Sequence, residues 1–134
     1  MNKAVMEQWV AALRSGEYKQ TEGRLRAFDD NNNQPTNCFC CLGVLCDLFA
    51  KTRTDCAWGE SDDEYEDCAF VVEDIETVDK VLPQLVRRWA GMNSECGDFF
   101  NEALKDEQRL TDMNDCGATF EELANVIEKN YEHL

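Results

Sequence analysis

The stretch CFCCLGVLCDLF, residues 38–49, holds the densest run of apolar side chains in the sequence. Leu42, Leu45 and Phe49 recur at the spacing of one helix face, so we expect a helix from Cys41 to Lys51. In that helix Cys41 and Cys46 lie among leucines and valine, which favours thiols that pack as small hydrophobic groups.

The eight cysteines do not have the spacing of a metal site. Cys38 and Cys41 form one C-x-x-C pair, no second pair follows, and the one histidine is His133. A structural zinc site uses two such pairs, or one pair with two histidines. Disulfides need an oxidising compartment, and residues 1–16 contain Glu7 and lack the continuous apolar core of an export signal. We therefore expect no metal and no cofactor, with zinc as the less favoured alternative.

Apolar periodicity predicts further helices on both sides of this stretch. They are expected at residues 1–15, 83–91 and 102–113, and after the capping box that begins at Thr119. Short strands are expected at 24–28 and 68–72, and loops at 29–36, 93–100 and 54–67, the last exposed and acidic. No repeat or linker divides the chain. We predict a single domain over residues 1–134 of the α+β class, mostly helical, with about five helices and a small antiparallel sheet or hairpin.

Composition excludes several classes of protein. The chain has 28 acidic residues against 13 basic ones, a formal net charge of −15. A nucleic-acid-binding protein needs a basic surface, so direct binding of nucleic acid is not expected. No apolar run approaches the ~18–20 residues that span a bilayer, so no membrane contact is expected either.

Catalytic motifs are absent from the sequence. There is no phosphate-binding loop, no dinucleotide-binding glycine motif and no nucleophile elbow. A nucleophile needs a neighbouring base, and His133 lies close to a chain end. We expect no catalytic residues, and a metal-dependent enzyme is the least favoured hypothesis.

Basic residues are concentrated near the amino end. Residues 1–28 hold five bases and three acids, a local net charge of 5 − 3 = +2. Arginine pairs suit bidentate contacts to phosphate, and a tyrosine can stack on a base. We therefore predict a binding site for a nucleotide-like anion formed by Arg14, Tyr18, Lys19, Gln20, Arg24 and Arg26. The alternative is that these bases pair with acids of the same molecule.

Two polar residues near the carboxyl end are added to this site. Asn114 and Asp115 precede Gly117, where they could read a base or a ribose. The alternative, which local sequence favours, is that they cap the neighbouring turn.

The segment 54–79 has the opposite charge. It contains eleven acids and no base: Asp55, Glu60, Asp62, Asp63, Glu64, Glu66, Asp67, Glu73, Asp74, Glu76 and Asp79. Such a surface could imitate nucleic acid or occupy a basic groove of another protein. A solubilising loop is the simpler interpretation.

An ordered set of motifs resembles a family of short proteins of tailed phages and prophages. The motifs are ALRSGEYKQ at 12–20, Gly23-x-Leu25-Arg26, FCCLGVLCDL at 39–48, Leu82-Pro83, Trp89-Ala90-Gly91 and MNDxGxTF at 113–120. The chain departs from the family pattern at Thr21, commonly glycine, and at Met113, usually leucine.

The resemblance implies an accessory protein in the cytoplasm of an infected bacterial host. Such proteins often oppose host defence, either by sequestering a nucleotide-derived immune signal or by blocking a defence protein. We expect a non-enzymatic counter-defence protein that binds a nucleotide-derived small molecule, in which a homo-oligomer could complete the pocket. The alternative is an acidic inhibitor or nucleic-acid mimic that binds a host defence protein through residues 54–79.

Overall fold

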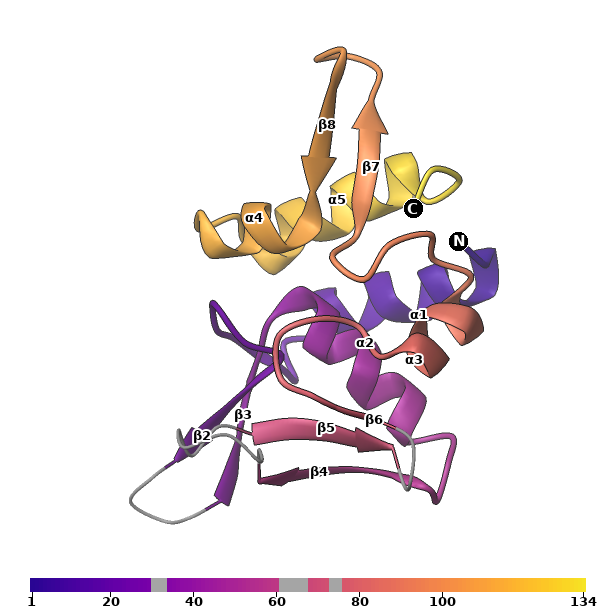
Figure 1. Cartoon of the computed structure of the whole chain (residues 1–134). Helices are drawn as coiled ribbons and strands as arrows, with labels where there is room; N and C mark the ends of the chain where they lie inside the picture. The colour runs from indigo at the N-terminus through magenta and orange to yellow at the C-terminus, as the bar shows by residue number, and fades with distance from the viewer. Residues whose placement is uncertain (30–33, 61–67, 73–75) are drawn as a thin grey trace.

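The computed structural model describes residues 1–29, 34–60, 68–72 and 76–134. Within these residues the chain forms five helices and eight strands (Figure 1). The helices are α1 (Lys3–Arg14), α2 (Cys41–Ala50), α3 (Gln84–Ala90), α4 (Leu110–Asp115) and α5 (Phe120–Asn130). The strands are β1 (Lys19–Gln20), β2 (Arg26–Asp29), β3 (Gln34–Phe39), β4 (Cys56–Glu60), β5 (Cys68–Val72), β6 (Glu76–Val78), β7 (Asp98–Asn101) and β8 (Asp106–Arg109).

Six strands form one mixed sheet. Its order is β1-β3-β2-β5-β4, and β6 also pairs with β5. The short pair β1 and β3 is parallel, while the remaining pairs are antiparallel. The longest ladder joins β4 to β5, where Cys56 faces Val72 and Glu60 faces Cys68.

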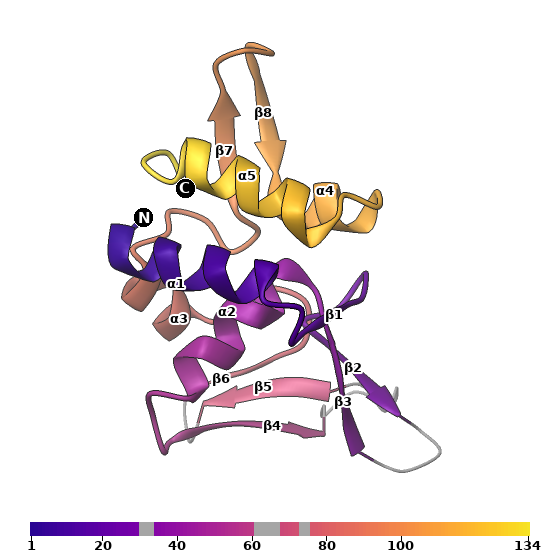
Figure 2. The ribbon, with the colours of Figure 1, turned by 180° about the vertical axis from the view of Figure 1, so that it is seen from behind.

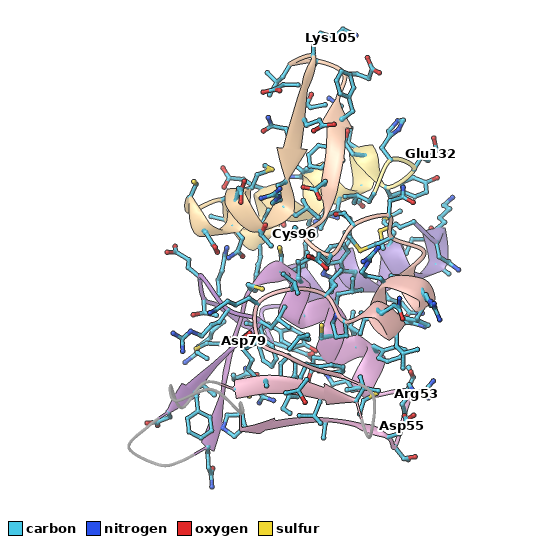
Figure 3. All side chains as sticks on the ribbon, viewed as in Figure 1. Arg53, Asp55, Asp79, Cys96, Lys105 and Glu132 are labelled. Atoms are coloured by element: carbon cyan, nitrogen blue, oxygen red, sulfur yellow. The ribbon has the colours of Figure 1, made fainter. Side chains whose placement is uncertain are left out.

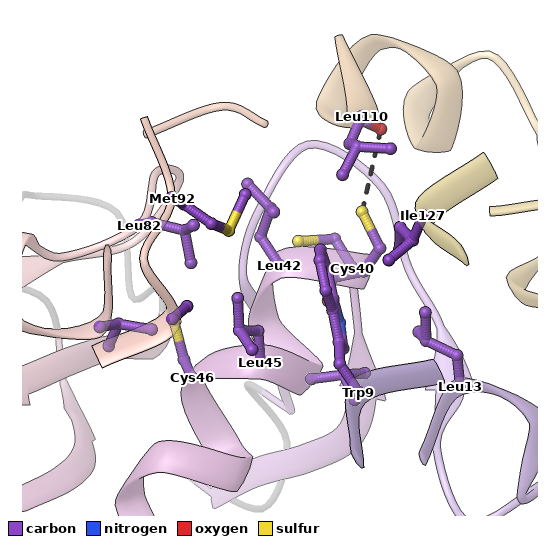
Figure 4. Close-up of a cluster of buried hydrophobic side chains, with 14 of the residues drawn as sticks. Trp9, Leu13, Cys40, Leu42, Leu45, Cys46, Leu82, Met92, Leu110 and Ile127 are labelled. Atoms are coloured by element: carbon purple, nitrogen blue, oxygen red, sulfur yellow. Dashed lines mark hydrogen bonds between the residues drawn. The ribbon is translucent and has the colours of Figure 1, made fainter. Parts of the chain in front are cut away.

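The helices lie in layers above this sheet. In both views α1, α2 and α3 lie between the sheet and the α4–α5 pair (Figures 1 and 2). Trp9 of α1 is completely buried, and its indole Nε1 donates a hydrogen bond of 2.9 Å to the carbonyl of Cys41. Leu42 and Leu45 of α2 and Ile127 of α5 meet in the same core (Figure 4). The apolar stretch that begins α2 is thus the centre of the core.

A close backbone approach sets the position of α2. Gly43 lies against the carbonyl of Leu25, so that a Cβ at this position would overlap the Leu25 oxygen. The same oxygen accepts a hydrogen bond of 3.1 Å from the Cys40 amide, just before α2 begins. Only glycine lets the first turn of the helix come this close to the chain before β2.

The fold is α+β, but the prediction of a mostly helical chain with a small antiparallel sheet is wrong. The six-stranded mixed sheet is a large part of the molecule. The short strands β1 and β6 carry too few residues for an alternating pattern to reveal them. Both are held by pairing with strands distant in the sequence rather than by local propensity.

The helix expected at 102–113 is wrong over residues 102–109, while residues 110–113 are helical as part of α4. Residues 98–109 form a two-stranded hairpin, β7 and β8, here called the arm, and helix begins only at Leu110. Residues 102–109 favour helix locally but contain just Ala103 and Leu104 as apolar residues, so a helix there would have no face to bury. The arm rises away from the helices in both views (Figures 1 and 2).

Three predicted loops contain strand. In the loop expected at 29–36, Asp29 belongs to β2 and residues 34–36 belong to β3. β7 occupies the end of the loop expected at 93–100, and β4 occupies 56–60 of the acidic loop expected at 54–67. Residues 61–67 of that loop lie outside the described part of the chain, as do residues 30–33 of the loop at 29–36. Among the described residues, no helix has both the length and the apolar character needed to cross a membrane.

The contact between Gly43 and Leu25 predicts a large effect for a very small substitution. Gly43→Ala should lower the free energy of unfolding by about 3 kcal/mol, because the added methyl group overlaps backbone that cannot rotate away. Urea unfolding measures the change. Gly59→Ala is the matched control, since its Cβ would only touch a Val71 methyl carbon at 3.5 Å. Equal stability of the two variants would contradict the steric explanation.

Candidate functional site

Arg14 binds acids of its own chain. Its Nε lies 3.1 Å from a carboxylate oxygen of Glu121, and its Nη2 lies 2.7 Å from one of Glu128. Nη2 also donates to the side-chain oxygen of Asn125 at 2.7 Å. Hydrogen bonding to Glu128 is the largest contribution that raises the pKa of Arg14. The guanidinium therefore fastens α1 to α5.

Tyr18 is buried, and its hydroxyl is fully used. It donates to Asp47 Oδ2 at 2.8 Å and accepts from Lys51 Nζ at 2.7 Å. Trp58 Nε1 donates to the other oxygen of Asp47 at 3.1 Å. The ring packs edge-on against Phe39, with centroids 5.2 Å apart. Tyr18 thus joins the chain before β1 to α2 and presents no free ring face of the kind a base stacks on.

Asp47 is the charged centre of this cluster. Burial raises the pKa of the Asp47 carboxyl, whereas hydrogen bonds from Tyr18, Lys51 and Trp58 together lower it by more. The pKa of Asp47 therefore lies below its usual value. Burial is the main cause that raises the pKa of Tyr18. Near neutral pH the cluster therefore holds an ionised Asp47 and a neutral Tyr18 hydroxyl.

Asn114 joins three segments of the chain. It is completely buried, and its Oδ1 accepts from Gln20 Nε2 at 3.1 Å and from the Cys41 amide at 3.2 Å. Its Nδ2 donates to the Thr21 carbonyl at 2.9 Å and to Asp115 Oδ1 at 3.0 Å. All four hydrogen-bonding positions of the amide are filled, so none is left to read a base.

Two neighbours complete this group, which we call the Asn114 junction. Gln20 Nε2 also donates to the Ala118 carbonyl at 2.7 Å, and Asp115 Oδ1 also accepts from the Gly23 amide at 3.0 Å. Asn114 and Asp115 therefore hold the distant turn at 20–23, whereas the capping alternative predicted that they hold the turn next to them in the sequence. Thr21 contributes its backbone carbonyl, so its side chain is not needed for this bond.

The remaining predicted bases lie around the sheet. Arg26 is half-buried, with its guanidinium carbon 4.6 Å from the centre of the Phe39 ring and its Nε donating to the Thr36 carbonyl at 2.7 Å. Lys19 is exposed on β1. Arg24 is half-buried and has an interaction partner within the chain.

The structure divides the eight predicted ligand-binding residues among several internal contacts. Arg14 reaches α5, Tyr18 reaches α2, and Gln20 meets Asn114 and Asp115. Of the eight, Gln20 lines an open hollow of about 460 Å³ together with Thr21, Glu22 and Gly117. The expectation that they converge on one anion pocket is not supported by these contacts, whereas pairing with acids of the same molecule describes Arg14 well.

The buried thiols serve packing. Cys40 Sγ accepts from the Gly43 amide at 3.4 Å and caps α2, and the Cys41 thiol points to the Leu110 carbonyl at 3.8 Å (Figure 4). Burial raises the pKa of Cys40 to about 11 and that of Cys41 well above its usual value. Both are therefore protonated at neutral pH, which makes them poor metal ligands and poor nucleophiles. No group of three or more metal-ligating side chains is found in the described ranges.

Sequence reasoning missed the arm. A hollow of about 310 Å³ lies at its base, lined by Asp98, Glu107, Gln108, Arg109, Asp112 and Met113. Phe100 and Leu104, on β7 and in the turn, are 43% and 64% exposed. Asn101, a residue type that favours turns, is the one local signal that could have suggested a hairpin here.

Comparison with known proteins identifies the family of the chain, which is described as a domain of unknown function. A family model described as "Domain of unknown function (DUF8296)" matches residues 1–131. No curated protein and no solved structure matches the chain.

The Asn114 junction predicts a strong dependence of stability on one amide. Asn114→Ala should lower the free energy of unfolding by about 3 kcal/mol, because it leaves the Cys41 amide and the Thr21 carbonyl without their partner. Denaturant unfolding gives the value. Asn125→Ala, which removes only the exposed contact with Arg14, should cost less than about 1 kcal/mol. Similar losses in both variants would contradict a special role for Asn114.

The Asp47 cluster predicts a pH dependence. A carboxyl whose pKa is lowered in the folded state adds stability above its unfolded pKa, and that stability is lost as the pH falls through the folded pKa. The difference in unfolding free energy between wild type and Asp47→Asn should therefore be largest near neutral pH and shrink below about pH 4. Urea titrations at pH 7 and pH 3 measure it. A difference that stays constant with pH would contradict the assignment.

Proposed function

The chain belongs to the DUF8296 family, and we propose that it acts without catalysis, as an acidic protein that binds a positively charged surface of another protein. One observation carries the proposal: several basic side chains of the described residues are paired with acids of the same chain. The ion pairs include Arg14 with Glu121 and Glu128, Lys51 with Asp47, Arg53 with Asp55, Lys80 with Asp79, Lys105 with Glu102, and Arg109 with Asp98 and Asp112.

Pairing of bases with acids of the same chain does not remove the excess of acids. The chain has 28 acids and 13 bases, so each base that pairs with an acid leaves the formal net charge of −15 unchanged. Uncompensated carboxylates steer a protein toward positively charged partners and away from other acidic ones. The excess of carboxylates therefore supports binding to another protein over binding of a nucleotide-like anion, which needs a cluster of basic side chains.

The predicted acidic segment is only partly described. Of its eleven acids, Asp55 and Asp79 have described side chains, and each pairs with a neighbouring base, Arg53 and Lys80. Hydrogen bonding to Arg53 holds the pKa of Asp55 at about 2. A role for the remaining acids of 54–79 in partner binding stays a prediction. If the accessory role implied by the phage resemblance is correct, the partner is a host defence protein in the bacterial cytoplasm.

A nucleotide-like ligand is the second candidate. The hollow is lined by Gln20 and Gly117, and the exposed Lys19 precedes Gln20 in the sequence, which favours a small ligand there. Glu22 on the rim disfavours an anion. A homo-oligomer could supply further groups to this hollow.

Salt dependence tests the protein-binding proposal. Partners captured from bacterial cells by the tagged protein are identified, purified and titrated against it by calorimetry at several salt concentrations. The affinity should fall about tenfold or more between ~50 and ~300 mM salt, because the contact depends on opposite charges. An affinity independent of salt, or a failure to bind any purified partner, would overturn the proposal.

Charge variants separate the acidic segment from the rest of the surface. Neutralising Asp62, Asp63, Glu64, Glu66 and Asp67 together should weaken binding if residues 54–79 make the contact. Unchanged binding would exclude that segment while leaving another acidic surface in place.

A thermal-shift screen tests the second candidate. Cyclic dinucleotides, cyclic ADP-ribose isomers and ordinary nucleotides are added to the purified protein. A ligand that binds beside Gln20 should raise the melting temperature with concentration, and the shift should be lost in Lys19→Ala. No shift with any of these nucleotides would remove this candidate.

A further inference from the structure

We infer that the arm, residues 98–109, is the element that docks on the partner, and that the partner presents basic side chains beside an apolar cavity. This inference rests on the proposed function and names its contact surface. In the described part of the chain, the exposed large hydrophobic residues are Phe100 and Leu104, and both belong to the arm. Elsewhere in that part the large apolar side chains are buried or half-buried.

One face of the arm combines apolar and acidic groups. In the hairpin register Phe100 lies opposite Glu107, and Asp98 lies opposite Arg109. Residues directly opposite, and residues two apart on a strand, share a face of the hairpin, so these four side chains lie together. The exposed Phe100 is therefore flanked by carboxylates rather than by further apolar groups.

The hollow at the base continues this face. It is lined by Asp98, Glu107 and Arg109 of the arm and by Asp112 and Met113 of α4. Three carboxylates line it, and Arg109 forms ion pairs with two of them, Asp98 at 2.7 Å and Asp112 at 3.9 Å. A lysine or arginine of a partner would find here the carboxylate of Glu107 and a methionine side chain on which its aliphatic stem can pack.

The tip of the arm is rigid. The side-chain oxygen of Asn101 accepts from the Ala103 and Leu104 amides at 3.0 and 3.2 Å, and the Asn101 carbonyl accepts from the Lys105 amide at 2.8 Å. Lys105, at the top of the arm in Figure 3, has a φ of 56°, the left-handed region that residues other than glycine rarely adopt. The backbone that carries the exposed Leu104 is thus held by hydrogen bonds, which reduces the entropy that binding must remove.

The base of the arm is fixed to the core. Phe99 is 3% exposed and Leu110 is completely buried, so the residues at the start of β7 and just after β8 are anchored. The Leu110 amide donates to the Gly97 carbonyl at 3.1 Å. A two-stranded hairpin alone is marginal in water, and this anchoring lets it project with apolar residues exposed.

The net charge of the arm indicates which kind of partner it binds. Residues 98–109 carry four acids (Asp98, Glu102, Asp106, Glu107) and two bases (Lys105, Arg109), a net of 2 − 4 = −2 within a chain of net charge −15. Self-association through this face would bring like charges together in a small contact area. A partner with basic side chains around an apolar cavity matches both the carboxylates and the exposed Phe100 and Leu104.

Photocrosslinking followed by titration tests the inference. A photoreactive phenylalanine analogue is placed at position 104 and, as control, at the exposed Lys129 of α5. Crosslinks to the partner should form from position 104 and not from 129, and should map to apolar residues with lysine or arginine beside them. Crosslinks from 129 alone, or a crosslinked surface rich in acids, would overturn the inference.

Matched variants measure the contribution of each group with the purified partner. Leu104→Ser and Phe100→Ser should each weaken binding roughly tenfold or more, while Ala103→Ser in the same turn leaves it unchanged. Glu107→Gln should weaken binding and reduce its salt dependence, whereas Glu7→Gln, which removes an equal charge from an exposed site on α1, should not.

The outcomes separate this inference from the proposed function. A partner that binds with strong salt dependence but tolerates all arm variants keeps the proposed function and overturns the role of the arm. If no purified partner binds, both fail. Sedimentation analysis of wild type and Leu104→Ser completes the test: a dimer of wild type that Leu104→Ser dissolves would show that the arm binds a second copy, which contradicts the inferred basic partner.

Discussion

The buried amide of Asn114 is the contact on which the arrangement of the chain most depends. It links the turn after β1, the first turn of α2 and the end of α4, three segments that lie far apart in the sequence. A buried amide with every position filled contributes specificity as well as stability, because any other packing of these segments leaves unpaired donors or acceptors. The close approach of Gly43 to Leu25 acts beside it, since it sets how near α2 can come to the chain before β2. Together these two contacts fix the helices over the sheet.

The motifs from which a resemblance to a phage family is predicted are largely parts of this framework. Gln20, Gly43, Asn114 and Asp115 all belong to such motifs, and each makes an internal contact that the fold requires. A concentration of polar and cationic residues near the amino end can therefore arise from the demands of packing, with no ligand involved. The arm lies between two of these motifs, after Gly91 and before Met113. A rigid framework on both sides allows this part of the chain to vary in sequence and still be held in place, as binding loops on stable scaffolds commonly are.

Local signals predicted elements whose own residues carry a clear pattern. The capping box at Thr119 begins α5, and the apolar run Cys68–Val72 forms β5 as expected. The sequence could not reveal β1 or β6, because two or three residues become a strand only when a distant strand pairs with them. Residues 102–109 favour helix by propensity, yet the buried Phe99 and Leu110 anchor both ends of a hairpin instead. Asn114 and Asp115 were recognised as candidate residues, but their partners, Gln20, Gly23 and Cys41, follow only from the tertiary fold.

Acidic side chains and exposed apolar side chains occur together on the arm. A protein that pairs many of its bases internally has little to offer a free phosphate, and its excess carboxylates favour a basic partner. Charge alone steers association but gives limited affinity, since exposed ion pairs contribute little. Affinity needs apolar groups that lose contact with water on binding. In the described part of the chain the exposed large apolar groups lie on the arm, among carboxylates and near a hollow lined by Asp98, Glu107 and Asp112. The arm is therefore the place where steering and affinity can act on one partner together.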